Sequence, residues 1–119
     1  MGERVAIVGS RGYQNPDEVF SYVHELPSDT VVVSGGAEGP DTWAEKVAKR
    51  RGLLVVVYRA DWSLYGKAAG PIRNAEIVAN CDRVVAFWDG HSRGTKSTID
   101  IAIRQGKPVE VHGLGEVER

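Results

Sequence analysis

Residues 31–41 read VVVSGGAEGPD, a run of β-branched residues that ends in a glycine cluster and continues into a helical pattern. Glycines at such a junction permit positive φ angles and let backbone N–H groups approach a ligand without a Cβ in the way. The N-terminus of the following helix adds unpaired donors and the positive end of the helix dipole. The stretch therefore predicts a loop that binds an anion, in particular the phosphate of a nucleotide.

Five short valine-rich runs alternate with four helical patterns along the chain. The apolar runs cover residues 4–8, 30–34, 53–58, 83–87 and 108–112. Short, continuously apolar runs are typical of parallel strands that helices cover on both faces. We therefore expect one Rossmann-like α/β domain over residues 1–119, with about five parallel strands in the order 3-2-1-4-5 and helices on both faces of the sheet.

Composition limits the classes of function. A chain of 119 residues with a net charge of -1 has no overall basic field, so a nucleic-acid partner is permitted but not favoured. The single cysteine, Cys81, and three scattered histidines indicate neither an internal disulfide nor a metal site. Since no apolar run is long enough to span a membrane and no signal peptide precedes the first strand, we expect a cytoplasmic protein without a membrane partner.

The expected architecture also indicates where a ligand binds. In an open parallel sheet, ligands lie beyond the carboxyl ends of the strands, near the point where the strand order reverses. Clusters of glycine and polar residues follow the first, second and fourth runs, and another opens the third helix. The expected ligand-binding residues are Gly9, Ser10, Arg11, Ser34, Gly35, Gly36, Gly39, Asp41, Arg73, Asn74, Asp89, Gly90, Ser92, Gly94 and Thr95.

These residue types suit a phosphorylated ligand. Glycine amides and the nearby serine and threonine hydroxyls would donate to phosphate oxygens, while Arg11 and Arg73 would neutralise the phosphate charge. Asp41 or Asp89 would accept a ribose hydroxyl or hold a hydrated Mg²⁺ brought by the phosphate. No cofactor is required for binding of this kind, and no catalytic residue is assigned.

Each cluster also has a purely structural interpretation. Glycines after parallel strands can simply shape tight turns, and Arg73 can be a solvated surface cation. Thr42 and Glu45 have the spacing of a capping box, in which case Asp41 only complements the dipole of its helix. The sequence leaves these alternatives open.

Large aromatic residues are more numerous than a small five-stranded core needs. They are Trp43, Trp62, Tyr65 and Trp88. Because aromatic side chains are enriched at the centres of protein interfaces, we expect a homodimer or a larger homo-oligomer.

Four segments, taken together and in order, resemble a known superfamily. They are Ile7-Val8-Gly9-Ser10-Arg11, residues 33–41, Gly70-Pro71-Ile72-Arg73-Asn74, and Gly94-Thr95. They resemble the Rossmann-like SLOG superfamily, which joins the Smf/DprA DNA-processing proteins with the Lonely guy phosphoribohydrolases. The resemblance covers residues 4–112 and is nearest to the YspA/YpsA-related branch of unknown function. It implies a nucleotide or nucleotide-derived ligand, such as a mononucleotide or an ADP-ribose-like molecule.

The same resemblance separates three functions. Lonely guy enzymes cleave the N-glycosidic bond of a nucleoside monophosphate with a glutamate whose position falls here on Thr98. A neutral hydroxyl cannot replace that carboxylate, so a nucleotide sensor or binding module is the leading interpretation. Hydrolysis through a displaced carboxylate, at Asp89 or Asp100, is the alternative. Binding of single-stranded DNA, as in the DNA-processing relatives, is the third.

Overall fold

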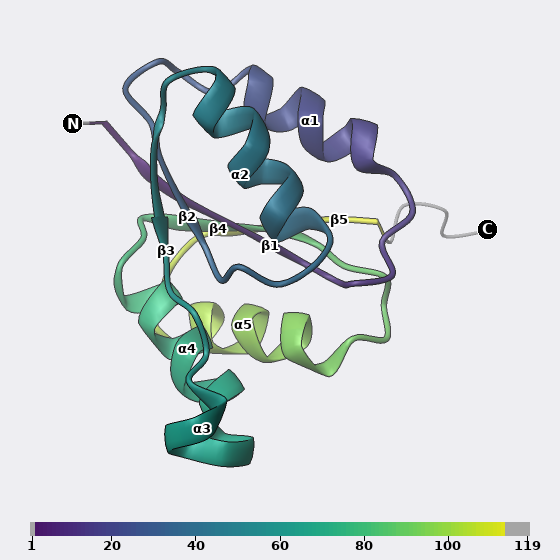
Figure 1. Ribbon diagram of the computed structural model, residues 1–119, viewed down its shortest axis with the longest axis vertical. Coiled ribbons are helices and arrows are strands. Elements are labelled where there is room, and N and C mark those ends of the chain that lie inside the picture. The colour runs from purple at the N-terminus through teal and green to yellow at the C-terminus, as the bar shows by residue number, and fades with distance from the viewer. Residues whose placement is uncertain (1, 114–119) are drawn as a thin grey trace.

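A parallel β-sheet with the strand order β3-β2-β1-β4-β5 forms the centre of the molecule (Figure 1). This computed structural model describes residues 2–113 of the chain. The strands are β1 (Arg4–Gly9), β2 (Val31–Ser34), β3 (Leu54–Val57), β4 (Arg83–Phe87) and β5 (Val109–His112). The fold class and the strand order predicted from the sequence are confirmed, and every strand begins and ends within one residue of its expected bounds.

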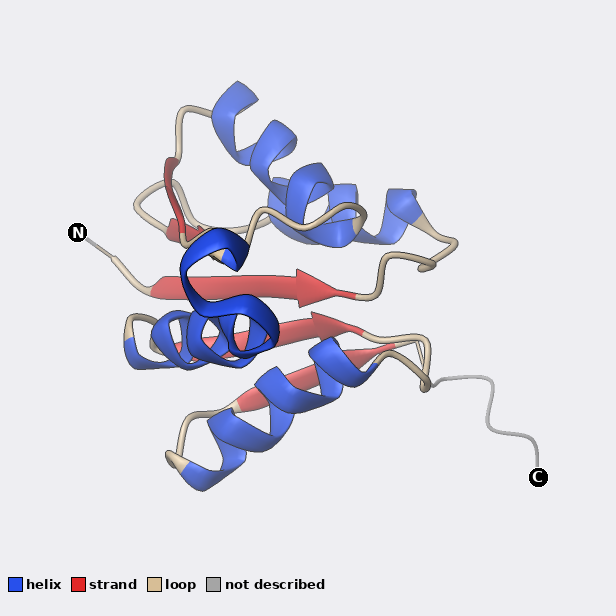
Figure 2. Ribbon diagram, turned by 60° about the horizontal axis from the view of Figure 1, so that its bottom comes forward, coloured by secondary structure: helices blue, strands red, loops and turns tan. Residues whose placement is uncertain are grey.

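Helices cover both faces of the sheet (Figure 2). They are α1 (Pro16–His24), α2 (Pro40–Arg50), α3 (Trp62–Tyr65), α4 (Ala69–Ala79) and α5 (Arg93–Arg104), with a 3₁₀ turn at Gly66–Ala68. Side chains of β1 alternate between the layers, since Val5 and Ile7 pack in the cluster that holds α1 and α2. Ala6 and Val8 pack in the cluster that holds α4 and α5. The period of two along the strand therefore builds two cores from one sheet.

The edge strands differ from the expectation that all strands are covered. β2 is fully buried, whereas Leu54 and Val56 of β3 and Val111 of β5 are exposed. Helices centred over β1, β2 and β4 do not reach the outer side of an edge strand. Burial on both faces therefore holds for the three central strands only.

The segment between β3 and α4 was not predicted. Asp61 caps the single turn of α3, because its Oδ1 atom accepts from the amide of Leu64 at 3.1 Å. α4 then begins at Ala69, with Pro71 inside its first turn. Proline is tolerated there because a first-turn amide has no partner within the helix.

The aromatic residues divide into two groups. Trp43 packs edge-to-face on Phe20, and the Nε1 atom of Trp88 donates to the carbonyl of Ser92 at 3.0 Å. Trp62 and Tyr65, on α3, are 59% and 48% exposed. Packing within the fold accounts for Trp43 and Trp88, but not for the exposed Trp62 and Tyr65. Within residues 2–113, no helix has the length and apolar character needed to cross a bilayer.

Candidate functional site

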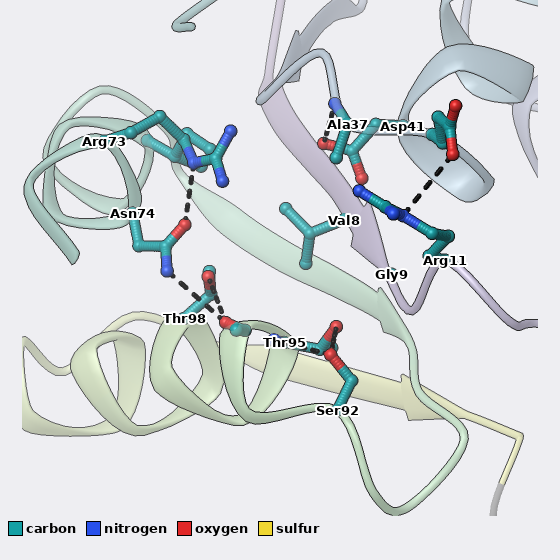
Figure 3. A pocket seen from close by; sticks show the side chains of 13 residues that line it. Val8, Gly9, Arg11, Ala37, Asp41, Arg73, Asn74, Ser92, Thr95 and Thr98 are labelled. Carbon is teal, nitrogen blue, oxygen red and sulfur yellow. Dashed lines mark hydrogen bonds and ion pairs between the residues drawn. The ribbon is translucent and has the colours of Figure 1, made fainter. Parts of the chain in front are cut away.

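A pocket of about 220 Å³ lies at the carboxyl end of β1, between the loop after β2 and the first turns of α4 and α5 (Figure 3). Eight of the residues expected from the sequence line it: Gly9, Arg11, Asp41, Arg73, Asn74, Ser92, Gly94 and Thr95. The remaining lining residues were not expected: Val8, Ala37, Glu38, Ile77 and Thr98. Val8, Ala37 and Ile77 are apolar and give no chemical signal. Glu38 is a carboxylate within the glycine loop but was not selected, and Thr98 was noted only through the resemblance. The tertiary structure thus brings residues of all four clusters to one place.

Two buried serines organise the loops around the pocket and do not line it. The hydroxyl of Ser10 accepts from the amide of Asp89 at 3.1 Å and lies 3.4 Å from the hydroxyl of Thr95. The hydroxyl of Ser34 donates to Glu45 at 2.6 Å and accepts from the amide of Gly36 at 3.1 Å. Ser10 directly follows β1 and Ser34 is the last residue of β2, and each serine ties its strand to a neighbouring loop or helix. In the structure, these two serines hold the loops around the pocket in place.

The loop after β2 does not offer the free amides that we expected for a phosphate. The Oδ2 atom of Asp41 accepts from the amides of Gly35 at 2.9 Å and Ala37 at 3.5 Å. The amide of Gly36 is already bonded to Ser34. The protein's own carboxylate therefore fills the nest that the glycine cluster forms.

The capping box, one of the two interpretations that the sequence left open for the start of α2, is not formed. Gly39, with φ of 96°, is the N-cap residue and has no side chain to accept from the helix. Thr42 donates to the carbonyl of Gly39 at 3.1 Å, and Glu45 is bonded to Ser34 instead of to a helix amide. The Thr42–Glu45 pair fits the local pattern, but burial of Glu45 gives it a partner from β2.

Asp41 is the most unusual residue of the pocket. Its side chain is buried, and its Oδ1 atom has no hydrogen-bond partner among the described residues. Burial raises the pKa of this carboxyl to about 7, against the opposing effect of the Gly35 and Ala37 amides and of the Arg73 charge. A carboxyl with one unpaired oxygen in a pocket is a candidate for direct contact with a ligand.

Arg73 and Asn74 connect three elements across the pocket. The Nη1 atom of Arg73 donates to the carbonyl of Gly35 at 2.7 Å, and its Nε atom donates to Oδ1 of Asn74 at 2.9 Å. The Nδ2 atom of Asn74 donates in turn to the carbonyl of Gly94 at 3.4 Å. A half-buried cation on α4 is thereby held between the loop after β2 and the N-terminus of α5.

The N-terminus of α5 forms the opposite wall (Figure 3). Ser92 is its N-cap residue and accepts from the amide of Thr95 at 3.4 Å. A Cβ added to Gly94 would meet no heavy atom within 4 Å, so this glycine faces open space. Thr98 donates to the carbonyl of Gly94 at 3.2 Å. In the described chain no acceptor pairs with the amide of Gly94, as expected in the first turn of a helix.

Arg11 is a weaker candidate than Arg73 for contact with an anion. Its Nε atom lies 3.4 Å from a carboxylate oxygen of Glu38, and the two side chains are 81% and 78% exposed. The pair lies at the mouth of the pocket, where Glu38 partly compensates the charge of Arg11. Arg73 therefore supplies the cation that the walls of the pocket hold in place.

Asp89 and Gly90 lie outside this pocket. Asp89 lines a neighbouring hollow with Tyr13 and Glu18. Its carboxylate accepts from the amides of His91 at 2.8 Å and Ser92 at 2.9 Å, and these bonds lower its pKa. Gly90, with φ of 86°, shapes the same turn. No group of three or more histidine, cysteine or acidic residues suited to a metal occurs in residues 2–113.

Comparison with known proteins decides the family. Residues 3–65 match the model of the YspA, cpYpsA-related SLOG family. The chain is also 39% identical over 116 residues to the Gene 61 protein of Mycobacterium phage D29, a match that covers 89% of this chain and 93% of the phage protein. The chain belongs to the YspA, cpYpsA-related SLOG family. The family expected from the four sequence segments is therefore confirmed.

Solved structures support the fold of this SLOG chain. DNA processing protein A of Streptococcus pneumoniae superposes with a TM-score of 0.79 at 24% identity, over 92% of this chain and 50% of that one. DNA processing protein A of Helicobacter pylori gives a TM-score of 0.71 at 24% identity, over 92% and 64%. The chain thus spans between half and two thirds of the length of these structural relatives. The shared feature is the Rossmann-like α/β domain.

Proposed function

We propose that this SLOG-family chain is a binding module for a nucleotide whose phosphate lies at the N-terminus of α5, beside Arg73. The observation that carries the proposal is the convergence on one pocket of a fixed arginine and a helix N-terminus whose Gly94 amide has no partner among the described residues. A helix N-terminus presents unpaired amides and a positive dipole end, which suit a phosphate group. Arginine adds charge-assisted hydrogen bonds in a planar fork.

Gly94 supports this position for the phosphate. Glycine in a helix costs about 0.5–1 kcal/mol relative to alanine. Neither a positive φ angle nor a close neighbour requires glycine at position 94. Gly94 lines the pocket, and a Cβ at this position would meet no heavy atom within 4 Å. A ligand that closely approaches the amides of α5 would explain why position 94 is a glycine.

The size of the pocket limits how much of the ligand it encloses. Its volume of about 220 Å³ is below the range of roughly 300–1,000 Å³ that is usual for pockets around drug-sized ligands. A phosphate and its sugar would be enclosed, while the base or a second sugar would lie over the loops at the mouth. A mononucleotide and an ADP-ribose-like molecule both fit this division, and either could bring Mg²⁺ with its phosphate.

Single-stranded DNA is the second candidate. DNA processing protein A of Helicobacter pylori has a single-stranded DNA binding mode. That protein shares the fold of this chain, and a nucleotide of a DNA strand carries the same phosphate chemistry. A nucleotide ligand and a DNA strand are therefore compared directly in the test below.

Hydrolysis of a nucleotide is less well supported. Asp100 pairs with Lys96 at 2.8 Å outside the pocket, and Asp89 lines the neighbouring hollow. Neither carboxylate proposed as a replacement for the Thr98 position therefore lines the pocket. A hydrolase built on this site would depend on Asp41, whose raised pKa of about 7 suits acid–base chemistry, or on Glu38.

Calorimetry on the purified chain tests the proposal. The probes are AMP, GMP, CMP, UMP, ADP-ribose, inorganic phosphate and a short oligothymidylate, with mass spectrometry of any small molecule that purifies with the protein. We expect at least one mononucleotide or ADP-ribose to bind, and we expect this binding to be lost in Arg73→Ala. Arg104→Ala, which removes an exposed arginine at the far end of α5, is the control and should bind as the wild type does. Binding of the oligonucleotide alone would favour the DNA candidate, and no binding by any probe at millimolar concentration would contradict both.

A further inference from the structure

We propose that Asp41 selects ligands with a free sugar hydroxyl next to the phosphate, so that the pocket takes a free ribonucleotide and not an internal nucleotide of a DNA strand. The inference rests on the proposed function, because it specifies the ligand of the same pocket. It begins from the unpaired Oδ1 atom of Asp41.

The two oxygens of Asp41 are in different situations. Oδ2 accepts from two loop amides, while Oδ1 is buried and has no partner among residues 2–113. Figure 3 shows the Asp41 carboxylate facing the pocket, with one oxygen bonded to the amide of Ala37. Native proteins rarely leave a buried polar atom unpaired without a functional reason. A hydrogen-bond donor on a bound ligand would give Oδ1 of Asp41 the partner that it lacks.

The neighbouring cations do not supply that donor. Arg73 donates to Gly35 and to Asn74, and Arg11 pairs with Glu38 at the mouth of the pocket. A fully ionised phosphate has acceptors only, so it cannot pair with a carboxylate oxygen. When Asp41 is ionised, the missing donor must therefore come from a part of the ligand other than its phosphate.

The position of Asp41 favours the sugar as that part. A Cβ built on Gly35 would lie 2.9 Å from Nη1 of Arg73 and 3.0 Å from Oδ2 of Asp41, so the two side chains flank the same glycine. The proposed phosphate contact and the unpaired carboxylate are thus close together. In a nucleotide the sugar is bonded directly to the phosphate, whereas the base is further away. A ribose hydroxyl is the donor nearest to the phosphate.

This donor distinguishes two sources of the same phosphate chemistry. A ribonucleoside 5′-monophosphate has free hydroxyls at both the 2′ and 3′ positions. An internal nucleotide of DNA lacks the 2′-hydroxyl, and its 3′ oxygen is esterified. Burial of Asp41 against a DNA strand would leave Oδ1 unpaired, which is unfavourable.

The test compares the four ribonucleoside 5′-monophosphates with their 2′,3′-dideoxy forms by calorimetry. The phosphates of each pair are the same, so the ratio of dissociation constants isolates the sugar hydroxyls. For the base that binds best, we expect the dideoxy form to bind at least about tenfold more weakly, the usual effect of losing a hydrogen bond to a charged group. Equal affinities in the wild-type protein would overturn the inference.

Asp41→Asn provides the matched variant. With its oxygen toward the amides of Gly35 and Ala37, the asparagine presents a neutral NH₂ group to the pocket, so the charge-assisted bond is lost and the preference for the hydroxylated ligand should fall severalfold. Asp100→Asn, a carboxylate outside the pocket, should keep the full ratio. A preference in Asp41→Asn as large as that of the wild type would overturn the assignment to Asp41.

A pH series on the wild-type protein gives a second measurement, should Asp41→Asn not fold. The charged or titratable groups that act on Asp41 are Arg73 from α4 and Glu45 from its own helix. When Asp41 is ionised, Oδ1 can accept from a sugar hydroxyl while Oδ2 accepts from the loop amides. The preference for the hydroxylated ligand should therefore increase between pH 6 and pH 8. A constant ratio would contradict the inference. If the two forms bind equally and binding still depends on Arg73, only this inference fails. If no monophosphate binds, the proposed function fails with it.

Discussion

Arg73 and Gly35, 38 residues apart in the chain, are joined by a 2.7 Å hydrogen bond from the guanidinium to the carbonyl oxygen. The bond fixes the cation of α4 against the loop after β2, at the edge of the pocket. It explains why a half-buried arginine stays in one position without a carboxylate partner among the described residues.

Arg73→Ala should weaken binding of the nucleotide by about 1.5–3 kcal/mol, the range of a hydrogen bond to a charged group. Arg73→Lys should recover little of the loss, because an ammonium lacks the planar fork that bonds Gly35, Asn74 and a phosphate together. Calorimetry measures the affinity, and urea unfolding checks that the variants are folded. Unchanged affinity in Arg73→Ala would show that the arginine is only structural.

Gly35→Ala and Gly94→Ala should have opposite effects on stability. A Cβ at position 35 would lie 2.9–3.1 Å from atoms of Arg73 and 3.0 Å from Asp41, so overpacking should destabilise the fold by about 1–3 kcal/mol. A Cβ at position 94 meets open space inside a helix, so alanine should stabilise the fold by up to about 1 kcal/mol. Urea unfolding of both variants measures the difference.

Gly94→Ala should at the same time weaken nucleotide binding, because Gly94 lines the pocket and an added methyl group would crowd a phosphate placed at its amide. A variant that is more stable and binds as well as the wild type would contradict the position that we propose for the phosphate.

Asp41 should make the protein more stable on mild acidification. Its pKa is about 7 in the folded protein and 3.8 in the reference state, so between these values the unfolded chain is ionised while the folded chain stays protonated. The free energy of unfolding should therefore fall as pH rises through this window, by about 1.4 kcal/mol per unit at most, and level off above pH 7. The stability difference between wild type and Asp41→Asn should be larger at pH 5 than at pH 8. Parallel urea-derived curves would contradict the raised pKa.

Release of free base from nucleoside monophosphates should be negligible. Loss of a positioned general acid or base reduces a rate by about 10²- to 10⁴-fold, and the resemblance to the Lonely guy enzymes places Thr98 at the position of their glutamate. Chromatography after long incubation with the four monophosphates measures any product. Turnover by wild type that disappears in Asp41→Asn, and persists in Asp100→Asn, would instead make this pocket the active site of a hydrolase.

Self-association should involve α3. Trp62, Leu64 and Tyr65 are 59%, 66% and 48% exposed, and aromatic side chains are enriched at interface centres. Light scattering at tens of micromolar protein should give a mass above the 12.9 kDa of one chain, and Trp62→Ala with Leu64→Ser should lower it. Ile103→Ser, an exposed apolar residue on α5, is the control. A monomeric mass for the wild type would overturn the prediction.

The sequence by itself determined the strands, the main helices and the edge of the sheet that holds the pocket. Valine runs and glycine clusters are local signals, and the rules for parallel sheets convert them into one strand order. The same signals missed α3, because one capped turn at Asp61 has no helical period to detect.

Only the tertiary structure decided which polar groups of the pocket are free. The glycine amides after β2 looked available in the sequence, but folding places Asp41 beneath them and Glu45 on Ser34. Arg73 looked like a surface cation as readily as a ligand contact, until packing of α4 brought it to Gly35. Each donor bonds to the acceptor that folding brings within reach, and partners such as Ser10 and Thr95, 85 residues apart, meet only when the whole sheet is formed.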